Sequence, residues 1–185
     1  KIIIKGKQTH GSSPWSGVDP IMISSQIVSA FNTIVSRKLD IRKLPAVISV
    51  GSIHGGVRSN IIPDEVVMEG TVRTYDPKMR DKIISEMTVL AESIAMMNNA
   101  SAEVIIPIGN NYPVTINDPD LTERVLPVLK KVIDSDEFLV RTDLSTGAED
   151  FSYYAQQVPS FFFFLGVTAE GKDWTKAAVN HSPYF

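Results

Sequence analysis

The chain has 185 residues, of which 43% are hydrophobic and 21% charged, a composition typical of globular proteins. This length fits one large domain or two small ones. A formal net charge of −3 and the lack of any basic run exclude the electrostatic surface that nucleic acids or acidic membranes require, so we expect neither as a partner. The sequence contains no cysteine, which excludes disulfides and thiolate metal sites.

The apolar runs and the first residue bear on the localisation of the protein and on the extent of the chain. No signal peptide is visible, and the longest apolar run, residues 161–165, is far too short to span a bilayer, so we expect a cytoplasmic protein. The first residue is Lys rather than Met and already lies in an apolar strand pattern. We therefore expect the chain to be part of a longer protein.

Strand and helix patterns alternate through the first 108 residues. Apolar runs at residues 1–5, 45–52 and 102–108 predict strands. Two Asp-Pro pairs, at residues 19–20 and 76–77, each predict a helix start with Asp as the N-cap. Apolar residues then recur every three or four positions, as in amphipathic helices. They are Ile23, Ile27, Ala30, Phe31 and Ile34 in the first helix, and Ile83, Met87, Leu90, Ala91 and Ile94 in the second.

The stretch 51–76 contains a further predicted strand with one apolar and one polar face. The apolar face carries Val66, Met68, Gly70 and Val72, and the other carries Val67, Glu69, Thr71 and Arg73. The element order is then β-α-β-β-α-β, which predicts a ferredoxin-like α+β domain with both helices on one face of a four-stranded antiparallel sheet. The free face either holds a carboxylate ligand through the fork of Arg73 or is an ordinary solvent-facing surface with paired charges.

The pattern changes near residues 109–115, so we divide the chain into residues 1–110 and 111–185. In the second part, residues 118–119 predict a third helix, residues 138–140 a brief strand, and Asp150 the N-cap of a short helix. Residues 160–166 form a continuous apolar run, as expected for a central strand buried on both faces. So short a segment cannot cover such a strand alone, so we expect its partners outside this chain.

Three histidines and one acidic pair are the candidates for chemistry. His10 lies in a Gly/Ser/Pro loop, where it is either an oxyanion donor or a solvated loop histidine. His54 follows a strand, and we interpret it as structural. His181 follows the apolar run in an Asn-His-Ser-Pro sequence and is a candidate metal ligand, although one histidine makes no site. For Glu149 and Asp150 we favour helix capping over acid-base chemistry.

Four motifs, in this order, resemble the M20 family of metal-dependent amidohydrolases and peptidases. Residues 5–21 (KGKQTHGSSPWSGVDPI) resemble the start of that family's lid, or dimerisation, domain, and residues 59–76 (SNIIPDEVVMEGTVRTYD) its second signature. Residues 147–154 (GAEDFSYY) and 181–183 (HSP) resemble the closing part of the catalytic domain. The similarity is closest to the branch of hippurate hydrolases, N-acyl-amino-acid deacylases and auxin-conjugate hydrolases, and it covers nearly the whole chain.

The resemblance implies a chemistry and a set of roles. In the family, a pair of zinc, manganese or cobalt ions activates a water that attacks an amide carbonyl. His10 matches the lid histidine that reaches the partner subunit's active site and stabilises the tetrahedral intermediate. Asn60 and Arg73 match substrate-binding residues, with Arg73 suited to a carboxylate, and Gly147 matches a glycine near that carboxylate. His181 matches the last metal ligand.

The chain also departs from the family pattern. The other metal ligands and the acid/base glutamate precede the lid in the family and are absent from this sequence, and a helix after HSP is missing. We therefore expect a lid domain at residues 1–110, a partial α/β catalytic segment at 111–185, and a homodimer formed through the lid. The parent is expected to hydrolyse N-acyl amino acids or small peptides, whereas this chain alone should be inactive and bind no metal. The alternative is a non-catalytic βαββαβ module for dimerisation or amino-acid binding.

Overall fold

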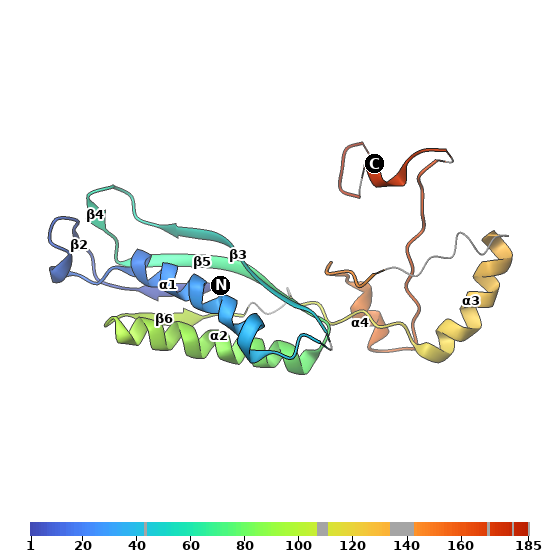
Figure 1. Ribbon diagram of the computed structural model, residues 1–185, viewed down its shortest axis with the longest axis horizontal. Helices are drawn as coiled ribbons and strands as arrows, with labels where there is room; N and C mark the ends of the chain where they lie inside the picture. The colour runs from blue at the N-terminus through green and yellow to red at the C-terminus, as the bar shows by residue number, and fades with distance from the viewer. Residues whose placement is uncertain (43, 107–110, 134–142, 170, 179, 185) are drawn as a thin grey trace.

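The computed structural model describes residues 1–42, 44–106, 111–133, 143–169, 171–178 and 180–184. Its first part contains a four-stranded antiparallel sheet in the order β3-β5-β1-β6. The strands of this sheet are β1 (Ile2–Lys5), β3 (Ala46–Gly55), β5 (Glu65–Thr74) and β6 (Ser101–Val104). Two short strands, β2 (Thr9–His10) and β4 (Ile61–Ile62), pair as a separate ribbon at one end of the domain (Figure 1).

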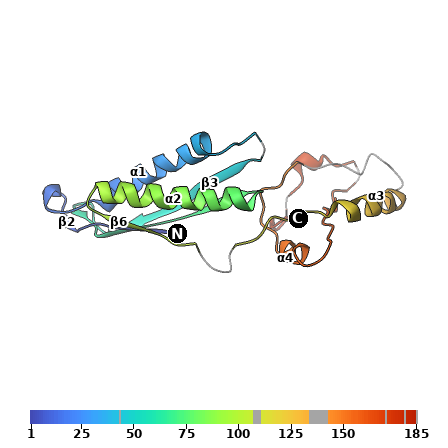
Figure 2. The ribbon, with the colours of Figure 1, turned by 90° about the horizontal axis from the view of Figure 1, so that it is seen from below.

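Two long helices lie side by side on one face of the sheet (Figure 2). They are α1 (Pro20–Thr33) and α2 (Pro77–Met97), and α1 runs on into a wider π-helical turn, Ile34–Lys38. A 3-10 turn, Pro14–Ser16, follows β2. The chain order and the sheet order together confirm the predicted ferredoxin-like fold.

Both helices begin at the aspartates that the sequence indicated. Asp19 Oδ1 accepts hydrogen bonds from the amides of Ile21 (2.9 Å) and Met22 (3.2 Å). Asp76 Oδ1 accepts one from the amide of Lys78 (2.8 Å). The free amides of the first turn are thereby satisfied, which fixes where each helix begins.

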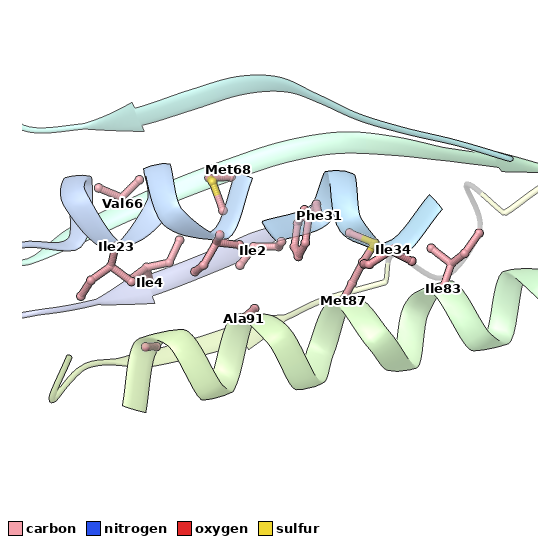
Figure 3. Close-up of a cluster of buried hydrophobic side chains, with 12 residues drawn as sticks. Ile2, Ile4, Ile23, Phe31, Ile34, Val66, Met68, Ile83, Met87 and Ala91 are labelled. Atoms are coloured by element: carbon pink, nitrogen blue, oxygen red, sulfur yellow. The ribbon is translucent and has the colours of Figure 1, made fainter. Parts of the chain in front are cut away.

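The core is a single apolar layer between the helices and the sheet (Figure 3). Ile23 and Ile27 of α1, Ile83 of α2 and Ile4 of β1 are all completely buried. Full burial of an aliphatic side chain of this size contributes about 1.5–3 kcal/mol. This layer is therefore the main source of stability in the first part of the chain, and it leaves the opposite face of the sheet uncovered.

The second part contains α3 (Pro119–Ile133), α4 (Phe151–Ala155) and a 3-10 turn, Trp174–Lys176. The predicted start of α3 is confirmed, since Asp118 Oδ1 accepts the amide of Leu121 (2.8 Å). No helix in the described part of the chain is both long and apolar enough to cross a membrane.

The strand predicted at residues 160–166 stays a prediction, because its partners were expected outside this chain. It has no partner strand among the described residues, and Phe163, Phe164 and Leu165 are 52%, 66% and 79% exposed. The Asn117 side chain donates to the Phe162 carbonyl (2.9 Å) and accepts from its amide (2.7 Å), and the Asp118 amide donates to the Ser160 carbonyl (2.9 Å). A strand needs repeated pairing along a ladder, and the described residues supply none for this run.

Three smaller predictions also need correction or lie outside the described structure. Asp150 is not the cap of α4, because its backbone is already helical and its side chain makes no capping bond; Glu149 Oε1 instead accepts the amide of Phe151 (3.3 Å). The strand predicted at 102–108 ends at Val104. Residues 107–108 and the strand predicted at 138–140 lie outside the described residues.

Candidate active site

His10 and Asn60 meet on the β2–β4 ribbon. In this ribbon His10 is paired with Ile61, and the amide of Gly11 donates to the Asn60 carbonyl (2.8 Å). The loop after β2 is short and hydrogen-bonded within itself, since the Ser13 amide donates to the His10 carbonyl (2.8 Å). The two predicted site residues are thus fixed next to each other, at the tip of the domain.

The local hydrogen bonds of His10 determine which ring nitrogen can act. The amide of Ser12 donates to His10 Nδ1 (3.1 Å), and the Ser12 hydroxyl lies 2.7 Å from the same atom. Because Nδ1 accepts from a backbone amide, the neutral ring carries its proton on Nε2. The side chain is exposed, and no described residue accepts from Nε2. His10 therefore presents an N–H donor to whatever approaches the tip, as an oxyanion stabiliser must.

Arg73 lies on the uncovered face of the sheet, near the other end of β5. It is paired with Val47 of β3, and its guanidinium has no hydrogen-bond or ion-pair partner among the described residues. The Tyr75 hydroxyl, two residues further on, is buried without a hydrogen-bond partner among the described residues, and burial raises the pKa of Tyr75. A half-buried arginine without a partner is a ready receptor for a carboxylate.

A cavity of about 330 Å³ adjoins Arg73. Its lining residues include the polar Thr71, Arg73 and Arg80 and the apolar Met68 and Met87. A few polar groups among apolar side chains are the usual make-up of a small-molecule site.

The structure separates Arg73 from the other two lid residues. β4 leads almost directly into Glu65, the first residue of β5, and Arg73 is eight residues further along the strand. At about 3.3 Å per residue, this places Arg73 roughly 26 Å from the ribbon end of β5. His10 and Asn60 therefore share one location, and Arg73 does not share it within one chain.

Gly147 lies in an exposed turn before α4. Its amide donates weakly to the Ser145 hydroxyl (3.3 Å), and a side chain placed on it would meet only that hydroxyl within 4 Å. Neither backbone geometry nor packing in the described structure explains a glycine here. A glycine also lets a ligand approach the backbone closely, which is a further physical reason for this residue type.

His181 stands alone as a candidate metal ligand. It is exposed and has a left-handed backbone (φ 70°), which a non-glycine residue adopts rarely. No group of three or more His, Cys, Asp or Glu side chains among the described residues could hold a metal ion. The described residues therefore do not form a metal site by themselves, since zinc takes three or four protein ligands.

Sequence reasoning missed two features of this site. Ser12 orients His10, and the only signal for it is a serine two residues after a loop histidine, which is too common to be informative. The contacts of Arg80 with Asn111 and of Tyr153 with Asn111 join distant segments, with separations of 31 and 42 residues, that no local pattern connects.

Comparison with known proteins assigns the family. Residues 1–96 match the family described as the peptidase dimerisation domain of M20. The whole chain is 40% identical over 185 residues to thermostable carboxypeptidase 2 of Saccharolobus solfataricus, of which it covers 45%. It is 36% identical over 189 residues to N-acetyl-L-cysteine deacetylase of Bacillus subtilis and covers 41% of that protein.

Solved structures agree with the sequence relatives. A tripeptidase from Staphylococcus aureus matches 85% of the chain with a TM-score of 0.68 and 27% identity, the match covering 40% of the tripeptidase. A dinuclear metal-binding peptidase of the M20 family from Bacillus subtilis matches 85% of the chain with a TM-score of 0.60 and 27% identity, covering 38% of that peptidase.

The chain thus spans less than half the length of the curated relatives it matches. Within that span, the family match, the sequence identity and the fold all agree. The chain belongs to the M20 family of amidohydrolases and peptidases, and its first 96 residues are the dimerisation domain of that family.

Proposed function

We propose that the complete protein is a metal-dependent amidohydrolase that cleaves the amide bond of N-acyl amino acids or small peptides. The names of its relatives, a carboxypeptidase and a deacetylase, support an amide substrate with a free carboxylate nearby. Arg73 is the receptor for that carboxylate, and the Nε2–H of His10 donates to the oxygen of the scissile carbonyl as charge develops there. Asn60, next to His10, supplies a second polar contact.

The separation of Arg73 from His10 and Asn60 carries the second part of the proposal, which is a site shared by two copies of the chain. β3 is an edge strand of the sheet. It runs from Ala46, beside the Arg73 end of β5, to Gly55, beside the β2–β4 ribbon. If two copies pair through β3 about a two-fold axis, the strands run antiparallel. The Gly55 end of one copy then lies beside the Ala46 end of the other, which brings His10 and Asn60 of one subunit toward Arg73 of its partner.

The surface beside β3 has the properties of a self-association surface. The sequence from Pro20 to residue 36, which spans α1 and continues beyond it, contains no charged residue. Ile21 and Met22 of α1 and Ile53 of β3 are 46%, 40% and 47% exposed. A long exposed edge without charged residues or proline is prone to pair with another strand, and a symmetric dimer covers it.

The metal enters this proposal only through His181. The described residues form no metal site by themselves. His181 supplies one imidazole ligand, and the remaining ligands come from a part of the enzyme that this sequence does not contain. This chain by itself is then inactive, although it carries the residues that recognise the substrate.

The guanidinium of Arg73, which has no partner among the described residues and lines a cavity, is the observation that carries the proposed function. The test is to incubate the complete protein with N-acetyl amino acids and with their C-terminal amides. We expect release of the amino acid from the carboxylates but little from the amides, loss of activity with a chelator, and recovery with zinc, manganese or cobalt. Equal hydrolysis of the carboxylates and the amides would contradict the role of Arg73. No hydrolysis of either substrate would contradict the proposed amidohydrolase activity.

His181 gives an independent prediction about metal content. Substituting His181→Ala in the complete protein should lower bound metal from two equivalents to about one, because each ion of a two-metal site depends on its own ligands. Metal analysis of the dialysed protein measures this, with His54→Ala as the matched control. Unchanged metal content in His181→Ala would remove this residue from the metal centre.

A further inference from the structure

A cluster of three contacts joins the two parts of the chain at Asn111. Arg80, near the start of α2, donates from Nη1 to Asn111 Oδ1 (3.0 Å). The Tyr153 hydroxyl in α4 donates to the backbone carbonyl of Asn111 (3.0 Å). The ring of Tyr153 also packs against that of Tyr112, with centroids 5.8 Å apart. Three segments distant in sequence therefore meet at one residue, and we refer to Arg80, Asn111 and Tyr153 as the joint.

The orientation of Arg80 is set from within α2. Asp81 Oδ1 accepts from Nε (3.3 Å) and Nη2 (3.1 Å) of the Arg80 guanidinium. These two contacts occupy one edge of the guanidinium and leave Nη1 for Asn111. Arg80 thus presents one fixed donor to the second part of the chain, instead of a freely rotating charge.

The joint is exposed, so the fold of neither part depends on it. The Arg80 side chain is 37% exposed, and Tyr112 and Tyr153 are 44% and 43% exposed. None of the three joint residues belongs to the buried layer between the helices and the sheet. Exposed polar contacts contribute little each, so the joint can open and close without unfolding either part.

The joint connects the two segments that carry proposed carboxylate contacts. Arg73 lies at the end of β5 that leads into α2, and Arg73, Arg80 and Asn111 line the same cavity. The turn with Gly147 leads directly into α4, which holds Tyr153. We propose that Arg80, Asn111 and Tyr153 are positioning residues, which hold the Gly147 turn in a defined place relative to Arg73. This inference rests on the proposed function, in which Arg73 contacts the substrate carboxylate, and on the family resemblance, which implies that Gly147 lies near the same carboxylate.

A distance measurement in the complete protein tests the joint without any activity. These 185 residues contain no cysteine, so once any cysteine outside them is replaced by serine, Ser85→Cys in α2 and Gln157→Cys after α4 give two exposed sites for spin labels. We expect one main distance between the labels by pulsed electron spin resonance. Tyr153→Phe removes the hydroxyl and keeps the ring, and it should raise the share of other distances about fivefold, as expected for one net hydrogen bond.

Tyr154→Phe is the matched control. Its hydroxyl has no hydrogen-bond partner among the described residues, so its distance distribution should equal that of the parent. If Tyr153→Phe and Tyr154→Phe gave the same distribution of label distances, the proposed joint would be wrong. A parent protein without one main label distance would also show that the joint does not form.

A kinetic measurement on the complete protein separates positioning from a general structural role. A carboxylate contact is made in the ground state and the transition state alike, so Tyr153→Phe should raise KM about fivefold and leave kcat unchanged. A lower kcat at unchanged KM would overturn the positioning role. If the complete protein hydrolyses no N-acyl amino acid, the proposed function fails, and the label distances still decide whether the joint exists.

Discussion

At the scale of single residues, His10 and Arg73 differ in their surroundings. Ser12 holds the Nδ1 of His10, which leaves its outer nitrogen as a donor at an exposed tip. Arg73 is half-buried on a sheet face with its guanidinium unpartnered among the described residues. In the proposed function, His10 meets charge that develops during the reaction, and Arg73 holds charge that is present throughout.

These environments predict different kinetic effects in the complete enzyme. His10→Ala should lower kcat by about 10²–10³ with little change in KM, as expected for loss of one oxyanion donor. Arg73→Ala should mainly raise KM, by roughly ten- to a hundredfold, because a hydrogen bond to a charged group is worth about 1.5–3 kcal/mol. Steady-state kinetics on both variants measure this. An unchanged kcat in His10→Ala would reduce His10 to an ordinary loop histidine.

At the scale of elements, the sheet is held by a close contact between β3 and β5 at Gly70. A side chain on Gly70 would collide with the carbonyl oxygen of Ser49 on β3, whereas one on Gly51, at the bulge in β3, would meet only the Glu69 carbonyl at 3.9 Å. The glycine at position 70 is therefore needed for strand packing, and the one at 51 has no such requirement.

This contrast predicts unequal effects of the same substitution. Gly70→Ala should destabilise the protein by about 1–3 kcal/mol, because strand β5 must shift to relieve the overlap. Gly51→Ala should lie within about 0.5 kcal/mol of the parent. Urea unfolding followed by circular dichroism gives both values. Equal stabilities of the two variants would show that β3 and β5 are not packed as closely as described.

The elements also show what could be predicted from the sequence. Both long helices begin at predicted aspartates and bury the predicted isoleucines, because caps and apolar periodicity are local signals. The run at 160–166 is largely exposed within this chain, and its burial stays a prediction because it depends on partners expected outside the chain. His10 and Asn60 were predicted as site residues, but their closeness to each other and the distance to Arg73 follow from strand pairing. Their roles stay predictions.

At the scale of the whole molecule, the proposed shared site follows from the layout of the dimerisation domain. The ribbon with His10 and Asn60 lies at one end of the sheet, and Arg73 lies near the other (Figure 1). The exposed edge of β3 runs between these two ends, next to a helix surface without charge. Two-fold pairing through this edge gives two equivalent sites, each with groups from both subunits.

Mixing two impaired variants of the complete protein tests this shared site most directly. One variant carries His10→Ala and the other Arg73→Ala, and activity is measured at low substrate after subunit exchange has been confirmed. In a mixed dimer, one site combines both substitutions and the other has neither. We expect random exchange to restore about a quarter of the parent activity, since half of the dimers are mixed and each has one intact site. If the mixture is no more active than the separate variants, then His10 and Arg73 act from the same subunit and the shared site is wrong.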